Sequence, residues 1–135
     1  MKAMPTVQKF MTTTPYTIGF DQTLAKAEGF MREHQIRHLP VLKGGKLIGV
    51  LTDRDVKLVQ SLSGTDSEVV TVEDACSLDP YITAPSAPID QVCQYMADKK
   101  YGCALIEDNK KLVGVFTWVD ALHALSELLK QRYHT

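Results

Sequence analysis

The strongest constraint on this 135-residue chain is an internal duplication. When the sequence is shifted by 65 positions and aligned with itself, the two copies match without a gap, and the heptads GVLTDRD (residues 49–55) and GVFTWVD (residues 114–120) match most clearly. Self-similarity at a fixed period is the signature of structural repeats, so the fold has to be built from two copies of one unit. Apolar positions stay in phase elsewhere, as in the pairs Val7/Val72, Leu24/Ile89, Ala27/Val92, Phe30/Tyr95 and Met31/Met96.

Each copy carries signals for the order β-α-β-β-α. A short extended piece (residues 16–18 and 81–83) precedes a helix, which is predicted over residues 24–34 in the first copy. Asp21 or Thr23 is the candidate N-cap of this helix. Its apolar face recurs in the second copy behind Pro88, and it comprises Leu24, Ala27 and Met31, matched by Ile89, Val92 and Met96.

A predicted β-hairpin follows each helix. In the first copy HLPVL and LIGVLT are joined through Gly44 and Gly45, which tolerate the positive φ of a tight turn. In the second copy CALIE and LVGVFT flank residues 108–110, where Asn109 supplies the turn. Both hairpins lead directly into a T-x-x-D motif and a final helix.

The final helix of the second copy is predicted over residues 119–133. Its leucines recur at helical spacing, which predicts ordinary core packing for the first half of the helix. The helix extends beyond the matched repeat, so the rest of its apolar surface is free for a partner chain. These leucines are Leu122, Leu125, Leu128 and Leu129.

The boundaries are predicted as repeat 1 over residues 7–60, a linker over 61–71 and repeat 2 over 72–131. The segment SLSGTDSE is polar and contains a glycine, as linkers do. A half of about 60 residues buries little core alone. We therefore expect an α/β (α+β) fold in which the two repeats pack with pseudo-two-fold symmetry into one module.

Composition excludes several classes of partner. The net charge is −1 and the lysines and arginines are scattered, so no nucleic-acid partner is expected. The sequence has no apolar run of membrane-spanning length and no signal-peptide pattern at its N-terminus, so no membrane partner is expected either. Three cysteines are an odd number without a C-x-x-C pair, which argues against a disulfide framework. These features predict a cytoplasmic protein.

The T-x-x-D motif permits two interpretations. In the first, the Thr side chain caps the helix and the acid three residues later completes a capping box. In the second, Thr52 and Asp55, with Thr117 and Asp120, grip a ligand at a strand-to-helix junction. Helix N-termini favour anions, and a carboxylate can accept hydrogen bonds from both hydroxyls of a ribose. A threonine can serve in both roles, so the two interpretations remain open.

The two copies differ in the residues around this motif. Arg37 and His38 precede a strand of the first copy, and Arg54 lies inside its motif; all three could contact a phosphate. The second copy has Tyr101-Gly102-Cys103 and Trp118-Val119 at the matching positions. Any two sites are therefore chemically unequal, one lined with cations and the other apolar and aromatic.

The residue spacings in the sequence give little support to a metal site or a catalytic site. His34 and His38 are four residues apart, but the first is predicted to end a helix and the second to begin a strand, so they form no helical metal face. No Ser-His-Asp or Cys-His arrangement has the spacing of a nucleophilic centre. An enzyme that uses Cys103 and His38 is a remaining alternative.

The sequence resembles a tandem pair of cystathionine-β-synthase (CBS) domains. The likeness is carried, in order, by MTTTPYTIGFDQTLAKA, IRHLPVL, GKLIGVLTDRD and KLVGVFTWVD, and it covers the chain from Val7 to the last helix. It implies a stand-alone pair of βαββα repeats, packed through their sheets with two symmetry-related clefts between them, and homodimers of disc-like shape. Such domains commonly bind AMP, ADP, ATP or S-adenosylmethionine and act as regulatory sensors. The resemblance thus implies an adenosine-containing regulatory ligand and no other cofactor.

The resemblance also implies which residues line each cleft. In the first cleft Asp120 would hold the ribose hydroxyls and Thr117 a phosphate or ribose oxygen, and the segments around Tyr16 and Ile36 would grip the adenine. Arg37 or His38 would contact phosphates, and Met11 and Thr14 are the remaining residues of this cleft. In the second cleft the expected residues are Thr52, Arg54, Asp55, Cys76, Asp79, Tyr81, Tyr101 and Gly102. Since this second set lacks the basic residues before its strand, the first cleft is predicted to be the better nucleotide site.

We therefore expect a non-enzymatic regulatory module that binds an adenine nucleotide or S-adenosylmethionine, forms a homodimer and regulates an unidentified protein. The alternative is a ligand-free module for dimerisation or partner docking, in which the T-x-x-D motifs are only helix caps.

Overall fold

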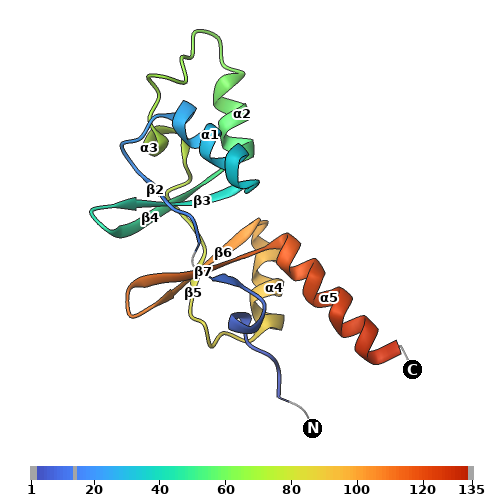
Figure 1. Cartoon of the computed structure of the whole chain (residues 1–135). Helices are drawn as coiled ribbons and strands as arrows, with labels where there is room; N and C mark the ends of the chain where they lie inside the picture. Colours follow the sequence, from blue (N-terminus) through green and yellow to red (C-terminus); the bar gives the residue numbers. More distant parts are fainter. Residues whose placement is uncertain (1–2, 14, 134–135) are drawn as a thin grey trace. The chain divides into compact units, whose positions relative to one another are not determined.

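The computed structural model describes residues 3–13 and 15–133, which form two compact units (Figure 1). One unit is the continuous stretch Tyr16–Pro80. The other combines the two ends of the chain, Met1–Pro15 and Tyr81–Thr135. The helices and strands confirm the mixed α+β class.

The unit formed by Tyr16–Pro80 contains a three-stranded sheet with the order β2-β3-β4. Strands β2 and β3 are parallel, and β3 and β4 form an antiparallel hairpin. The elements of this unit are β2 (Ile18–Gly19), α1 (Leu24–His34), β3 (His38–Lys43), β4 (Lys46–Thr52), α2 (Asp53–Gln60) and α3 (Val72–Ala75).

The other unit contains a four-stranded sheet with the order β1-β7-β6-β5. Strands β6 and β7 form its hairpin, and β1 adds to the outer edge of β7 in antiparallel orientation. The elements of this unit are η1 (Val7–Lys9), β1 (Thr12–Thr13), β5 (Ile82–Thr83), α4 (Ile89–Lys99), β6 (Cys103–Asp108), β7 (Lys111–Thr117) and α5 (Trp118–Tyr133).

The predicted order β-α-β-β-α is confirmed in both copies. Of the two candidate caps for α1, Thr23 is the N-cap, because its side chain accepts a hydrogen bond from the Lys26 N–H. The hairpin turns also fall where predicted. Gly44 and Gly45 have φ of 58° and 78°, and in the second copy Asn109 shares the left-handed conformation with Lys110, at 52° and 64°.

Each unit has its own hydrophobic core. The predicted helix positions are buried: Leu24, Ala27 and Met31 in one core, and Ile89, Val92 and Met96 in the other. Each core also includes one residue from the segment that precedes the opposite copy. Val7 is fully buried beside α4, and Val72 is fully buried beside α1.

The predicted core packing of the first half of the last helix is wrong. Along α5 only Ala124 is buried, and the leucines at both ends of the helix are about half exposed. The signal was a run of leucines at helical spacing, which indicates an apolar face but does not say what covers that face. The exposed leucines are Leu122, Leu125, Leu128 and Leu129.

Candidate functional site

Both T-x-x-D motifs form capping boxes at a junction between a strand and a helix. At the start of α2, the Thr52 N–H donates to Asp55 Oδ2 at 2.9 Å, and the Asp55 N–H donates to Thr52 Oγ1 at 3.1 Å. At the start of α5, the corresponding distances between Thr117 and Asp120 are 2.9 and 3.3 Å. The capping interpretation is therefore confirmed for both copies.

The capping contacts leave part of each carboxylate available. In both boxes the oxygen that accepts from the threonine is Oδ2. Asp55 and Asp120 are half-buried, and the helix N-terminus beside each of them provides a positive end of the backbone dipole. A carboxylate that caps through one oxygen can still accept a ligand hydroxyl through the other.

The first hairpin brings Arg37 and His38 to the same end of the sheet as the first motif. His38 lies opposite Thr52 in the β3-β4 ladder, and the Arg37 carbonyl accepts a hydrogen bond from the Asp53 N–H at 3.0 Å. The Arg37 and Arg54 side chains are exposed. Two guanidinium groups, which can bind phosphate oxygens, are thus carried by the segments that meet beside this capping box, together with the carboxylates of Asp53 and Asp55.

The second copy repeats the backbone geometry without the cations. Cys103 lies opposite Thr117 in the β6-β7 ladder, and the Gly102 carbonyl accepts from the Trp118 N–H at 3.1 Å. Tyr101 precedes this point and is half-buried. The predicted chemical inequality of the copies is therefore present at matching positions of the two units.

A close backbone approach accompanies each motif. A Cβ on Gly49 would fall 3.3 Å from Cys76 Sγ and closer still to the Ser77 carbonyl oxygen. At the matching position, a Cβ on Gly114 would collide with the Met11 side chain. Met11 and Cys76 are thereby held against the strands that lead into Thr117 and Thr52, respectively.

Each unit also contains an aromatic cluster that was not predicted from the sequence. Tyr81, Tyr95 and Tyr101 lie with ring centroids 4.4 to 6.0 Å apart. In the other unit Tyr16 stacks on His34 at 4.0 Å, and Phe30 contacts both rings. The matched pair Phe30/Tyr95 was the available signal, because it places an aromatic ring on the same helix position in both copies.

Burial keeps the thiols protonated. Desolvation raises the pKa of Cys103 to about 12, and burial is also the main reason that the pKa values of Cys76 and Cys93 are raised. Burial likewise raises the pKa of the Tyr81 hydroxyl. A nucleophilic cysteine needs a lowered pKa, so these shifts count against thiol chemistry.

The described residues supply no metal centre. Within residues 3–13 and 15–133, no group of three or more His, Cys, Asp or Glu side chains is arranged to hold a metal ion. None of the helices in these ranges is long and apolar enough to cross a membrane.

The predicted clefts draw residues from both units. For the first cleft, Met11, Thr117 and Asp120 lie in one unit, whereas Tyr16 and the segment 36–38 lie in the other. For the second, Thr52, Arg54, Asp55, Cys76 and Asp79 lie in one unit, and Tyr81, Tyr101 and Gly102 in the other. Thr14 lies outside the described residues. The pairing of these half-sites across the units stays a prediction.

The repeated unit, with a capped junction after each hairpin, defines a tandem-repeat α+β protein. The family model of the CBS domain matches it twice, at residues 7–61 and 69–127. The CBS domain-containing protein YhcV of Bacillus subtilis is 31% identical over 112 residues, which are 83% of this chain and 79% of YhcV. The chain therefore belongs to the CBS domain family, as a tandem pair.

Solved structures show the same fold. The CBS domain pair of protein MJ0100, in complex with 5′-methylthioadenosine and S-adenosyl-L-methionine, matches with a TM-score of 0.85 and 20% identity, over 93% of this chain and 99% of that one. CBSX2 in complex with AMP matches with a TM-score of 0.77 and 22% identity, over 92% of this chain and 98% of that one.

Proposed function

We propose that this protein is a regulatory module that senses an adenosine-containing ligand: AMP, ADP, ATP or S-adenosylmethionine. The observation that carries the proposal is the pair of capping boxes, each of which holds a carboxylate at a helix N-terminus with one oxygen engaged and the other available. A ribose presents two adjacent hydroxyl groups, and a carboxylate can accept hydrogen bonds from both of them.

The related folds support an adenosine ligand. Two proteins of the same fold are seen with AMP, or with S-adenosyl-L-methionine and 5′-methylthioadenosine, and these molecules share an adenosine group. The common chemistry comprises a flat base, a ribose diol and a variable group on the 5′ carbon.

The better site is proposed to combine Thr117 and Asp120 with Arg37 and His38. Asp120 would accept from the ribose hydroxyls. The Thr117 hydroxyl, which donates to Asp120 Oδ2 at 3.3 Å, would turn to donate to a ribose or phosphate oxygen instead. Arg37 carries an exposed guanidinium that can bind phosphate oxygens in a bidentate manner. The backbone near Tyr16 and Ile36 would hold the base, and Met11 completes this set of residues.

The opposite site is proposed to be the weaker one for nucleotides. It would combine Thr52, Arg54 and Asp55 with aromatic surface from Tyr81 and Tyr101. Asp79 adds negative charge, and Gly102 stands where the first copy has Arg37. A nucleoside without phosphates suits this set better than a charged nucleotide.

The module is proposed to act without catalysis, in the cytoplasm and as a homodimer that signals to a regulated protein. The raised pKa of Cys103 supports the absence of thiol chemistry, and the three free cysteines suit a reducing compartment. The competing function is ligand-free docking, in which both motifs act only as helix caps.

Isothermal titration of the protein with AMP, ADP, ATP and S-adenosylmethionine tests the proposal. Asp120→Ala should raise the dissociation constant of the best ligand by about tenfold or more, because a hydrogen bond to a charged group contributes about 1.5–3 kcal/mol. Asp120→Asn is the matched control for the cap, since it keeps an oxygen for the Thr117 N–H but loses the charge, and it should also bind weakly. Asp55→Ala should have a smaller effect.

Tight binding by Asp120→Ala would show that the site is assigned to the wrong carboxylate. If the wild-type protein binds none of the four ligands and still forms a stable dimer, the docking function replaces the sensing function.

A further inference from the structure

Tyr16 is an exposed aromatic side chain whose ring is nevertheless supported by two other rings. It is 47% exposed, and its ring stacks on His34 with the centroids 4.0 Å apart and the planes 23° apart. The Phe30 ring lies 4.4 Å from His34 and 5.4 Å from Tyr16. These three distances place Phe30 on the same side of Tyr16 as His34, so neither ring covers the opposite face of Tyr16. That face is the part of the ring that a ligand can reach.

The support for Tyr16 comes from a rigid element. His34 is the last residue of α1, and Phe30 lies one turn before it on the same side of the helix. The helix is fixed to the core of its unit by a buried face that includes Met31. An exposed tyrosine without such neighbours would sample several rotamers, whereas a ring that is already ordered loses less entropy when a ligand binds.

Tyr16 lies at the end of the sheet where Arg37 is found. Strands β2 and β3 are parallel with Ile18 opposite Val41, so Tyr16 comes level with the first residues of β3. Strand β3 begins at His38, directly after Arg37. The segments that lead into two adjacent strands of one unit therefore carry an aromatic ring, which suits a flat base, and a guanidinium, which suits a phosphate.

The second copy does not repeat this arrangement. Tyr81, which matches Tyr16, is half-buried, and two further tyrosine rings lie at centroid distances of 4.4 and 5.7 Å from it. Lys99, an exposed residue at the end of α4, stands at the position that matches His34. The exposed and supported ring thus belongs to the copy that also carries Arg37, which favours a base that is joined to a phosphate.

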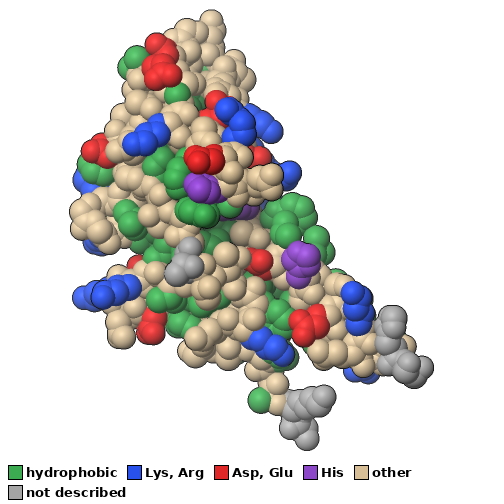
Figure 2. All heavy atoms as spheres, in the orientation of Figure 1, with side chains coloured by type: hydrophobic (Ala, Val, Ile, Leu, Met, Phe, Trp, Pro, Cys, Tyr) green, Lys and Arg blue, Asp and Glu red, His purple; other side chains and the backbone are tan. Residues whose placement is uncertain are grey.

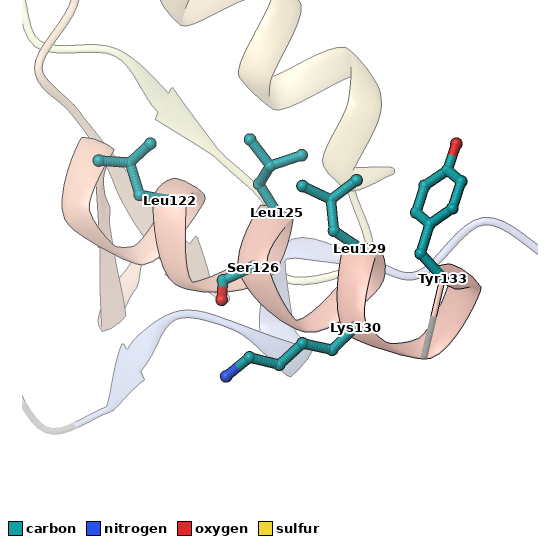
Figure 3. Close-up of a pocket in the computed structure, with 6 residues that line it drawn as sticks. All are labelled: Leu122, Leu125, Ser126, Leu129, Lys130 and Tyr133. Carbon is teal, nitrogen blue, oxygen red and sulfur yellow. The ribbon is translucent and has the colours of Figure 1, made fainter. Parts of the chain in front are cut away.

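A groove on α5 is a less suitable place for a base. It has a volume of about 470 Å³ and is lined by residues between Leu122 and Tyr133. Figure 3 shows its three leucines and Tyr133 projecting from the same side of the helix, and Figure 2 shows hydrophobic side chains over the first turns of α5. Every lining residue comes from one helix, so no opposite wall encloses a ligand. Within residues 3–13 and 15–133, no aromatic ring contacts Tyr133, whereas two contact Tyr16.

We infer that His34 is a positioning residue of the proposed nucleotide site: it holds the Tyr16 ring so that the opposite face of that ring stacks on the base of an adenine nucleotide. This inference rests on the function proposed above, and it adds His34 and Phe30 to the residues that determine affinity. The base forms the third layer of a stack that begins at His34. His34 acts on affinity through Tyr16, without contacting the ligand.

Isothermal titration with AMP tests the role of this stack. His34→Ala should raise the dissociation constant of AMP by about three- to tenfold, because Tyr16 then has to be ordered when the ligand binds. His34→Phe keeps a flat ring at this position and should bind AMP nearly as the wild type does. Lys99→Ala, at the matching position of the second copy, is the control and should leave the dissociation constant unchanged. Circular dichroism checks that the variants are folded.

A double-mutant cycle distinguishes positioning from a general effect on the fold. Tyr16→Leu removes the ring and should raise the dissociation constant of AMP by about tenfold or more, as expected for the loss of one base–aromatic stack. If His34 acts through Tyr16, the variant with both His34→Ala and Tyr16→Leu binds AMP as weakly as Tyr16→Leu alone. Effects of the two changes that multiply would show that His34 acts independently, and would overturn its positioning role.

The outcomes separate this inference from the function on which it rests. A wild type that binds none of AMP, ADP, ATP and S-adenosylmethionine overturns both. A wild type that binds S-adenosylmethionine but not AMP overturns the inference alone, and so does a folded His34→Ala variant that binds AMP as tightly as the wild type. Leu125→Ala tests the groove on α5: if this change weakens AMP binding and Tyr16→Leu does not, the base lies on α5 and the inference is wrong.

Discussion

Gly49 lies against the backbone of the segment that leads into the second copy. Val50 and Ser77 exchange two backbone hydrogen bonds of 3.0 Å, and a Cβ at position 49 would collide with the Ser77 carbonyl oxygen. At the matched Gly114 the obstructing atoms belong to the flexible Met11 side chain. Gly49 and Gly114 occupy equivalent positions in the duplication. The neighbour of Gly49 is rigid backbone, whereas the neighbour of Gly114 is a flexible side chain.

Gly49→Ala should lower the free energy of unfolding by about 1–3 kcal/mol, because the methyl group forces the Ser77 backbone away. Gly114→Ala should cost less, since Met11 can change rotamer. Gly29→Ala in α1 is the control: nothing lies within 4 Å of the added methyl group, and the helix should gain about 0.5–1 kcal/mol. Urea denaturation gives the three values, and equal stability of the Gly49 and Gly29 variants would contradict the steric argument.

At the level of elements, local signals were sufficient for the helices and hairpins. Thr23 and the T-x-x-D motifs start helices through contacts within three residues, and Gly44 and Gly45 set the turn between β3 and β4. Pairings between segments that are far apart in the sequence could not be predicted from these local signals. In strand β1, Thr12 pairs with Val115 of β7, and the local sequence of a two-residue strand does not predict which strand it will pair with.

In the candidate site, too, the features set by local sequence could be predicted and those set by contacts between distant segments could not. The capping boxes follow from the T-x-x-D spacing, so Thr52, Asp55, Thr117 and Asp120 could be named from the sequence. The aromatic clusters depend on which helix lies beside which strand, and no spacing rule reveals that. The leucines of α5 were predicted to be core in the first half of the helix, because hydrophobic periodicity identifies an apolar face but does not show whether the same chain covers that face.

Removal of either cap should have a similar, modest effect on stability. Thr52→Ala and Thr117→Ala each lose the side-chain acceptor for an N–H of the first helical turn, which costs about 1 kcal/mol. Thr52→Ser and Thr117→Ser keep the oxygen and should be close to wild type. Thermal unfolding by circular dichroism measures both pairs. A loss of several kcal/mol in either alanine variant would mean that the threonine supports more than its helix.

At the scale of the whole molecule, each compact unit depends on a segment from the opposite copy. The Val7 N–H donates to the Ala87 carbonyl and the Ile89 N–H to the Pro5 carbonyl, so the start of the chain is tied to the entrance of α4. In the other unit the Val72 N–H donates to the Gln22 carbonyl, and the Leu24 N–H donates to the Val70 carbonyl. Neither repeat, taken as a continuous piece of sequence, therefore contains its complete core.

This exchange predicts that a mutation near the N-terminus acts on the second repeat. Val7 and Val72 are both fully buried, in the cores of α4 and α1 respectively. Val7→Ala should cost about 2 kcal/mol and should speed hydrogen exchange in β6 and β7, roughly 100 residues further along the chain, more than in β3 and β4. Val72→Ala should do the reverse. Exchange measured by mass spectrometry on both variants, with the exposed Val69→Ala as control, resolves the two units. If Val7→Ala instead speeds hydrogen exchange more in β3 and β4, the start of the chain stabilises its own repeat. The conclusion that each unit depends on a segment from the opposite copy would then be wrong.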